Sequence, residues 1–119
     1  MHETSLCAAL LRLVQEEAHR HRAERIVGVR LGVGVLAAVE PHALRACFEL
    51  LAEGTVAEGA DLKVDLIPAD AVCRACGRAF PLIRPRDVCP TCGGAALDLT
   101  GGRECTLTGL EASLCGEKI

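Results

Sequence analysis

Two short cysteine motifs are the part of this sequence best suited to chemistry. Each reads Cys-x-x-Cys-Gly, their cysteines are Cys73, Cys76, Cys89 and Cys92, and twelve residues lie between Cys76 and Cys89. Two thiolates three residues apart on a tight turn can both reach one ion, and the glycine allows a left-handed backbone that turns N–H groups toward sulfur. Four sulfurs in tetrahedral geometry favour a closed structural Zn²⁺ site.

Other uses of these cysteines stay open at this point. A rubredoxin-type iron or an Fe–S cluster fits the same spacing, because ligand type alone does not separate iron from zinc. A redox pair at residues 89–92 is disfavoured, since it opens no helix in a βαβ unit. Disulfides are disfavoured as well: the N-terminus carries Glu3 where a signal peptide needs a basic residue, so we expect a cytoplasmic protein with reduced or metal-bound thiols.

The first residues form a second potential ligand set. The terminal amine of Met1, together with the amide and imidazole of His2, provides three nitrogens within one short chelate. Planar nitrogen donors suit Ni(II) or Cu(II) better than Zn²⁺. Glu3 or Glu40 can add an oxygen, and His42 is an outer candidate. Taken alone the pattern is weak, because a terminal histidine is usually a solvated side chain.

Hydrophobic periodicity indicates the elements that must position these residues. We expect a helix over 5–21, a strand over 25–35, a helix from Glu40-Pro41 to near Gly54, and strands over 61–67 and 104–114. In the first strand, Val27, Val29, Leu31, Val33 and Val35 occupy every second position, whereas the other face is rich in glycine. The strand–helix–strand order can form a crossover between parallel strands.

Residues 69–103 lack this periodicity and hold both cysteine pairs, so they need a metal rather than an apolar core for order. We therefore expect an α+β fold, with two helices packed on a small three-stranded mixed sheet and an inserted zinc-ribbon-like four-cysteine lobe. The expected domains are 1–68 with 104–119, and 69–103.

Composition restricts the function further. The net charge of −3 gives no electrostatic argument for nucleic-acid or membrane binding, and no apolar run is long enough to span a bilayer. Residues 73–103 carry a local charge of +3, so a zinc-ribbon module that binds protein or nucleic acid is the alternative. That segment has one aromatic residue, Phe80, and no platform for base stacking. No catalytic triad, phosphate loop or carboxylate pair indicates an enzyme.

Several segments carry a family resemblance over nearly the whole chain. They are residues 1–7 (MHETSLC), 25–29 (RIVGV), 39–40 (VE), 48–49 (FE) and 54–59 (GTVAEG), together with the two cysteine pairs in order. The sequence thereby resembles the hydrogenase nickel-incorporation proteins of the HypA/HybF family.

The resemblance implies a specific function. The family consists of metallochaperones that deliver nickel to the large subunit of [NiFe]-hydrogenase, acting with the accessory GTPase HypB, and some members serve urease maturation. It implies a Ni(II)-binding α/β domain with Met1 and His2 as ligands and Glu3 as the adjoining acid. It also implies a separate Zn(II) domain, whose ligands map onto Cys73, Cys76, Cys89 and Cys92.

Overall fold

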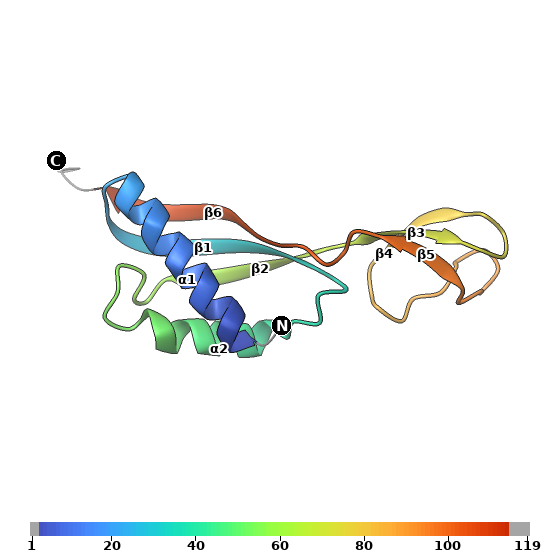
Figure 1. The fold of residues 1–119 in the computed structure, drawn as a ribbon, viewed down its shortest axis with the longest axis horizontal. Helices are drawn as coiled ribbons and strands as arrows, with labels where there is room; N and C mark the ends of the chain where they lie inside the picture. The colour runs from blue at the N-terminus through green and yellow to red at the C-terminus, as the bar shows by residue number, and fades with distance from the viewer. Residues whose placement is uncertain (1–2, 115–119) are drawn as a thin grey trace. The chain divides into compact units, whose positions relative to one another are not determined.

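The computed structural model describes residues 3–114, which fall into two compact units (Figure 1). The first, here called the helix–sheet unit, comprises Met1–Leu31, Val39–Val64 and Leu107–Ile119. The second, the cysteine unit, comprises Gly32–Ala38 and Asp65–Thr106. Each unit is described by itself below.

The helix–sheet unit contains two helices and most of a three-stranded sheet. Its elements are α1 (Glu3–Arg20), β1 (Ala23–Gly34), α2 (Pro41–Ala52), β2 (Asp61–Ile67) and β6 (Cys105–Leu114). The strand order is β2-β1-β6. Figure 1 shows β1 and β2 running in the same direction and β6 in the opposite one, so the sheet is mixed. The α+β fold class predicted from the sequence is confirmed.

Apolar side chains from both helices and the sheet form the core of this unit. The largest fully buried side chains include Val14, Leu44, Phe48, Ile26, Val29 and Leu31. The helices α1 and α2 meet where the thiol of Cys7 donates to the carbonyl of Leu44 at 3.3 Å. The buried residues of α1 and of α2 recur at helical spacing, so each helix has one apolar side that faces the core.

The beginning of β1 differs from the sequence expectation. Val27 is 43% exposed, whereas Ile26, expected on the opposite face, is 1% exposed. The amide of Ile26 donates to the carbonyl of Val56, 2.9 Å away in the segment after α2. This contact holds the start of the strand against a loop, so the alternation of buried residues slips between Ile26 and Val29.

The cysteine unit contains three short strands that the sequence did not predict. They are β3 (Ala69–Cys73), β4 (Ala79–Leu82) and β5 (Leu97–Thr100), which form an antiparallel sheet in the order β4-β3-β5. Strands of four or five residues are too short to show a clear period in sequence. The small core of this unit consists of Val35, Ala69, Ala71 and Leu82.

A close approach between two backbones explains one glycine of β1. The amide of Gly34 donates to the carbonyl of Glu104 at 2.7 Å, and that of Leu36 to the carbonyl of Gly102 at 2.6 Å. A Cβ atom added at Gly34 would overlap the backbone of Gly102. Residues 32–38 therefore belong with the cysteine unit, although they lie more than thirty residues before its first cysteine.

Candidate metal centre

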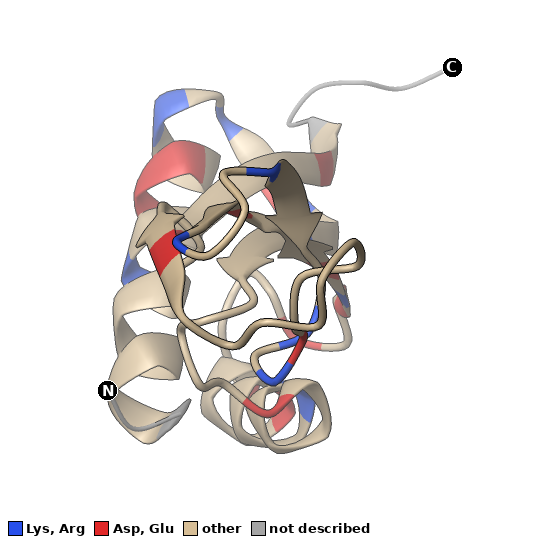
Figure 2. Ribbon diagram, turned by 90° about the vertical axis from the view of Figure 1, so that its right-hand side faces the viewer, with Lys and Arg blue, Asp and Glu red and all other residues tan. Residues whose placement is uncertain are grey.

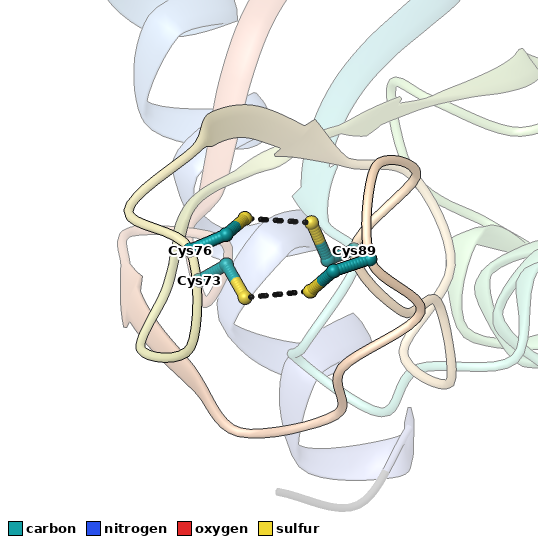
Figure 3. Close-up of side chains that lie close together, drawn as sticks. Cys73, Cys76 and Cys89 are labelled. Carbon is teal, nitrogen blue, oxygen red and sulfur yellow. Dashed lines mark hydrogen bonds between the residues drawn. The ribbon is translucent and has the colours of Figure 1, made fainter.

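The four cysteines singled out in the sequence converge in the cysteine unit. All four Sγ atoms lie within 4.8 Å of one another. The sulfurs approach crosswise between the two motifs, with Cys73 and Cys92 separated by 3.6 Å and Cys76 and Cys89 also by 3.6 Å (Figure 3). The fold thus brings together the residues that the sequence proposed as one ligand set.

Each motif folds into a knuckle, and the two knuckles have the same pattern of backbone hydrogen bonds. They comprise residues 73–78 and residues 89–94. The amide of the first cysteine donates to the carbonyl five residues later, from Cys73 to Arg78 at 2.8 Å and from Cys89 to Gly94 at 2.9 Å. The glycine four residues after each first cysteine, Gly77 or Gly93, donates back to that cysteine's carbonyl at 2.8 Å. These glycines have φ of +78° and +74°, a conformation costly for any residue with a Cβ.

The first knuckle is attached to the sheet of the cysteine unit. Cys73 is the last residue of β3, and the amide of Arg74 donates to the carbonyl of Ala96 at 2.9 Å. The Arg74 side chain also forms an ion pair with Asp98 of β5 at 2.8 Å. The orientation of this knuckle therefore follows from the pairing of β3 with β5.

The sulfur geometry fits a tetrahedral metal ion. Sulfurs 3.6 Å apart are well beyond the S–S bond length of about 2.05 Å, so these cysteines are free thiols rather than disulfides. Four ligands at a Zn–S distance of about 2.3 Å in a tetrahedron would lie roughly 3.8 Å from one another. The observed spacing needs little adjustment to reach that arrangement. With four protein sulfurs, the coordination is complete and leaves no position for a substrate.

The four thiols share their protons unequally. The backbone N–H of Cys92, followed by that of Thr91, lowers the pKa of Cys89 to about 6 despite its burial. The backbone N–H of Cys76 likewise lowers the pKa of Cys73. The pKa of Cys92 rises to about 11: the N–H of Gly94 acts to lower it, but hydrogen bonding with Cys73 and burial outweigh that effect. A bound cation would displace the protons that remain.

Two side-chain contacts of the site were not predicted from the sequence. The Arg74–Asp98 ion pair supports the first knuckle, and the Arg78 guanidinium donates to the hydroxyl of Thr91 at 2.6 Å, which joins the two knuckles. In the sequence, both arginines count only toward the local charge of +3 over residues 73–103. No spacing rule could have found these contacts, because each joins residues more than ten positions apart.

The arginines of the cysteine unit are partly matched by nearby acids. Besides the Arg74–Asp98 pair, Arg84 lies 3.8 Å from Asp87, and Figure 2 shows blue and red segments interspersed in this unit. This pairing weakens the case for a nucleic-acid module, which needs unpaired cations along a continuous surface. None of the described helices is long and apolar enough to cross a membrane.

The structure describes only some of the residues predicted to bind nickel. Met1 and His2 lie outside the described residues, and Glu3 begins α1. The carboxylate of Glu40 caps α2, because its Oε2 accepts from the amide of Ala43 at 2.7 Å. That hydrogen bond, followed by one from the His42 amide, lowers the pKa of Glu40.

Comparisons with known proteins place these features in context. Residues 1–112 match the family model described as "Hydrogenase/urease nickel incorporation, metallochaperone, hypA". The hydrogenase maturation factor HypA of Methylocella silvestris is 38% identical over 111 residues, which are 93% of this chain and 98% of that protein. Hydrogenase maturation factor HybF of Klebsiella pneumoniae is 40% identical with the same coverage.

A solved structure agrees with the sequence matches. The solution structure of the Ni metallochaperone HypA from Helicobacter pylori has a TM-score of 0.66 and 28% sequence identity, covering 96% of this chain and 99% of that one. The family model, the relatives and the fold all point to the same group, and the resemblance drawn from the sequence is confirmed. The chain belongs to the HypA family of hydrogenase nickel-incorporation metallochaperones.

Proposed function

We propose that this chain binds Ni(II) reversibly at its N-terminus and delivers it during [NiFe]-hydrogenase maturation, while a resident Zn²⁺ is held by the four cysteines. The observation that carries the proposal is the group of four sulfurs within 4.8 Å, in a chain whose match to a nickel-incorporation family runs from residue 1 to 112. The helix–sheet unit would then handle nickel. The zinc part would be centred on residues 69–103.

Cys73, Cys76, Cys89 and Cys92 would hold the zinc. Zn²⁺ would supply a redox-inert cross-link between the two knuckles and no reactive chemistry, since four protein ligands close the site. Thiolate sulfur also accommodates iron, so metal analysis of the purified protein is the direct test of zinc. One zinc per chain without iron is the expected result.

Nickel is the cargo and needs a weaker, accessible site. The amine of Met1 and the amide and imidazole of His2 offer planar nitrogen donors that Ni(II) accepts, and Glu3 can add a carboxylate oxygen. Few donors and a terminal position favour fast exchange, which a delivery protein requires. Glu40 is the second carboxylate considered, and its carboxylate also caps α2 through the amide of Ala43.

The partners follow from the family rather than from a surface of this chain. We propose the hydrogenase large subunit as the recipient and the accessory GTPase HypB as the source of nucleotide energy, because this sequence contains no phosphate-binding loop. Urease maturation proteins are a second possible client, since the family description names urease as well as hydrogenase. We also propose that this protein acts in the cytoplasm and is not itself an enzyme.

Nickel titration of the untagged protein tests this function. His2→Ala should abolish tight nickel binding and leave one zinc per chain, whereas His21→Ala, which alters an exposed residue next to α1, should bind nickel as the parent does. Adding one glycine before Met1 should also weaken nickel binding, because it moves the terminal amine out of the chelate. Undiminished nickel affinity in His2→Ala would reject the site.

A further inference from the structure

The two knuckles are equivalent in backbone but not in the side chains where they meet. The sulfurs pair crosswise, and each knuckle contributes two comparable positions: the second and the fifth residue after its first cysteine. These are Ala75 and Arg78 in the first knuckle, and Thr91 and Gly94 in the second. If the two knuckles met symmetrically, the fifth position of each knuckle would lie beside the second position of the other.

The structure shows that arrangement on both sides of the sulfur cluster. On one side, Arg78 Nη1 donates to Thr91 Oγ1 at 2.6 Å. On the other side, a Cβ atom added at Gly94 would lie 3.7 Å from the Cβ of Ala75. The same positions are thus neighbours twice, but among the described residues only the first side has a side-chain hydrogen bond between them.

This difference matters for release of a metal ion. An ion held by sulfurs from both knuckles leaves when the sulfurs of one knuckle detach, so the knuckles must separate. Among residues 3–114, the Arg78–Thr91 bond is the side-chain hydrogen bond that joins the knuckles apart from the thiols themselves. A hydrogen bond with an ionised donor is stronger than a neutral one and has a defined geometry. The Arg78–Thr91 bond therefore opposes separation of the knuckles on its side of the cluster.

We propose that Arg78 and Thr91 are positioning residues that set the rate at which the four-cysteine site releases its metal. The inference rests on the proposed role of the four cysteines as metal ligands. Neither side chain contacts the ion: each acts by keeping the two knuckles, and hence two pairs of sulfurs, in register. Loss of the hydrogen bond should speed opening without altering the sulfur ligands.

Transfer of zinc from the full-length, zinc-loaded protein to a chromogenic chelator measures this rate. The chelator is used at concentrations where the rate no longer depends on it, so that opening of the site limits transfer. Thr91→Val removes the hydroxyl with little change in shape, and Arg78→Met keeps the apolar stem. Arg84→Met is the matched control, because it removes an exposed ion pair with Asp87 in the same unit and leaves both knuckles and the bond between them intact.

Thr91→Val and Arg78→Met should each release zinc roughly three- to tenfold faster, as expected for one exposed charge-assisted hydrogen bond. The double variant should release zinc no faster than the faster of the two single variants. Thr91→Ser keeps the hydroxyl and should release zinc at the parental rate. Arg84→Met should stay within about twofold of the parent.

Three results would overturn the inference: a parental rate in Thr91→Val, equal acceleration in Arg84→Met, or multiplied effects in the double variant. A parent protein that holds no metal would reject the ligand assignment itself, and the inference with it. Urea unfolding of the helix–sheet unit serves as the structural readout and should be unchanged in every variant.

Discussion

The two units of this protein reach an ordered structure by different means. The helix–sheet unit buries large apolar side chains from two helices and a sheet, among them Leu44, Phe48 and Ile26. The cysteine unit has a core of four residues, two of them alanines, and four thiols clustered within 4.8 Å. Because this apolar core is small, we expect a metal ion held by the four thiols to supply much of the order of the cysteine unit.

Magnitudes support this division. Burying a large aliphatic side chain contributes about 1.5–3 kcal/mol, so the core of the helix–sheet unit can offset the entropy of ordering its elements. Ala69 and Ala71 remove far less apolar area from water. Binding of a structural zinc ion by cysteine ligands is worth on the order of 10 kcal/mol or more, which exceeds what that small core provides.

Removing the metal should therefore give the largest effect. In Cys73→Ser, or in the parent with excess chelator, we expect the amide resonances of residues 69–103 to lose dispersion while those of α1 and α2 keep theirs. Cys105→Ser, which changes an exposed cysteine outside the cluster, is the control. A cysteine unit that keeps its dispersed spectrum without metal would show that its apolar core suffices.

A substitution in the apolar core of the helix–sheet unit should destabilise that unit and leave metal binding by the cysteine unit unchanged. Leu44 is fully buried on α2, and Leu44→Ala should lower the unfolding free energy by about 2–5 kcal/mol through lost burial and a residual cavity. Zinc content should stay at the parental value. Leu50→Ala on the same helix is the control, because Leu50 is 71% exposed. Urea denaturation followed by helix signal gives the measurement, and equal losses in both variants would contradict the core assignment.

Crowding the sulfur cluster should have an intermediate effect. A Cβ at Gly94 would lie 3.2 Å from the Cys92 sulfur and 3.5 Å from that of Cys73, and sulfurs fixed by an ion cannot move away. Gly94→Ala should cost the metal-bound state about 1–3 kcal/mol, seen as weaker zinc retention in a chelator competition.

Ala95→Ser, an exposed neighbour of Gly94, should leave zinc retention unchanged. The backbone of Gly94 lies outside the left-handed region, so strain in the alanine backbone is not the expected cause. Parental zinc retention in Gly94→Ala would mean that the cluster has room for a methyl group.

The smallest effect concerns acid and the start of α2. Hydrogen bonds from the amides of Ala43 and His42 lower the pKa of Glu40. Its stabilising contribution is therefore complete above the ordinary value of 4.5 and is lost as pH falls through the lowered pKa. Glu40→Gln should lower the hydrogen-exchange protection factors of the first-turn amides of α2 at pH 6 and reduce the loss of protection on acidification to pH 3.

Glu49→Gln, farther along α2, is the control for a charge change on the same helix. Zinc content at pH 6 should be the same in both variants, because Glu40 belongs to the helix–sheet unit. A first turn of α2 that exchanges at the parental rate in Glu40→Gln would reject the capping role.

Local sequence patterns predicted much of the fold. The apolar spacing of Leu6, Leu10 and Val14 indicated the first helix, Glu40-Pro41 marked the start of the second, and alternation over residues 61–67 matches β2. These elements follow from contacts within a few residues of one another. The strands β3, β4 and β5 were missed because pairing between distant segments, rather than intrinsic alternation, creates them.

The sequence by itself determined which four cysteines can form a metal site, because the i, i+3 spacing and the following glycine are local properties of each knuckle. The tertiary structure decided how the knuckles meet. It paired Cys73 with Cys92 and Cys76 with Cys89, placed Arg78 beside Thr91, and packed Gly34 against Gly102. Each of these contacts joins residues at least thirteen positions apart, so chain packing and not local spacing controls them.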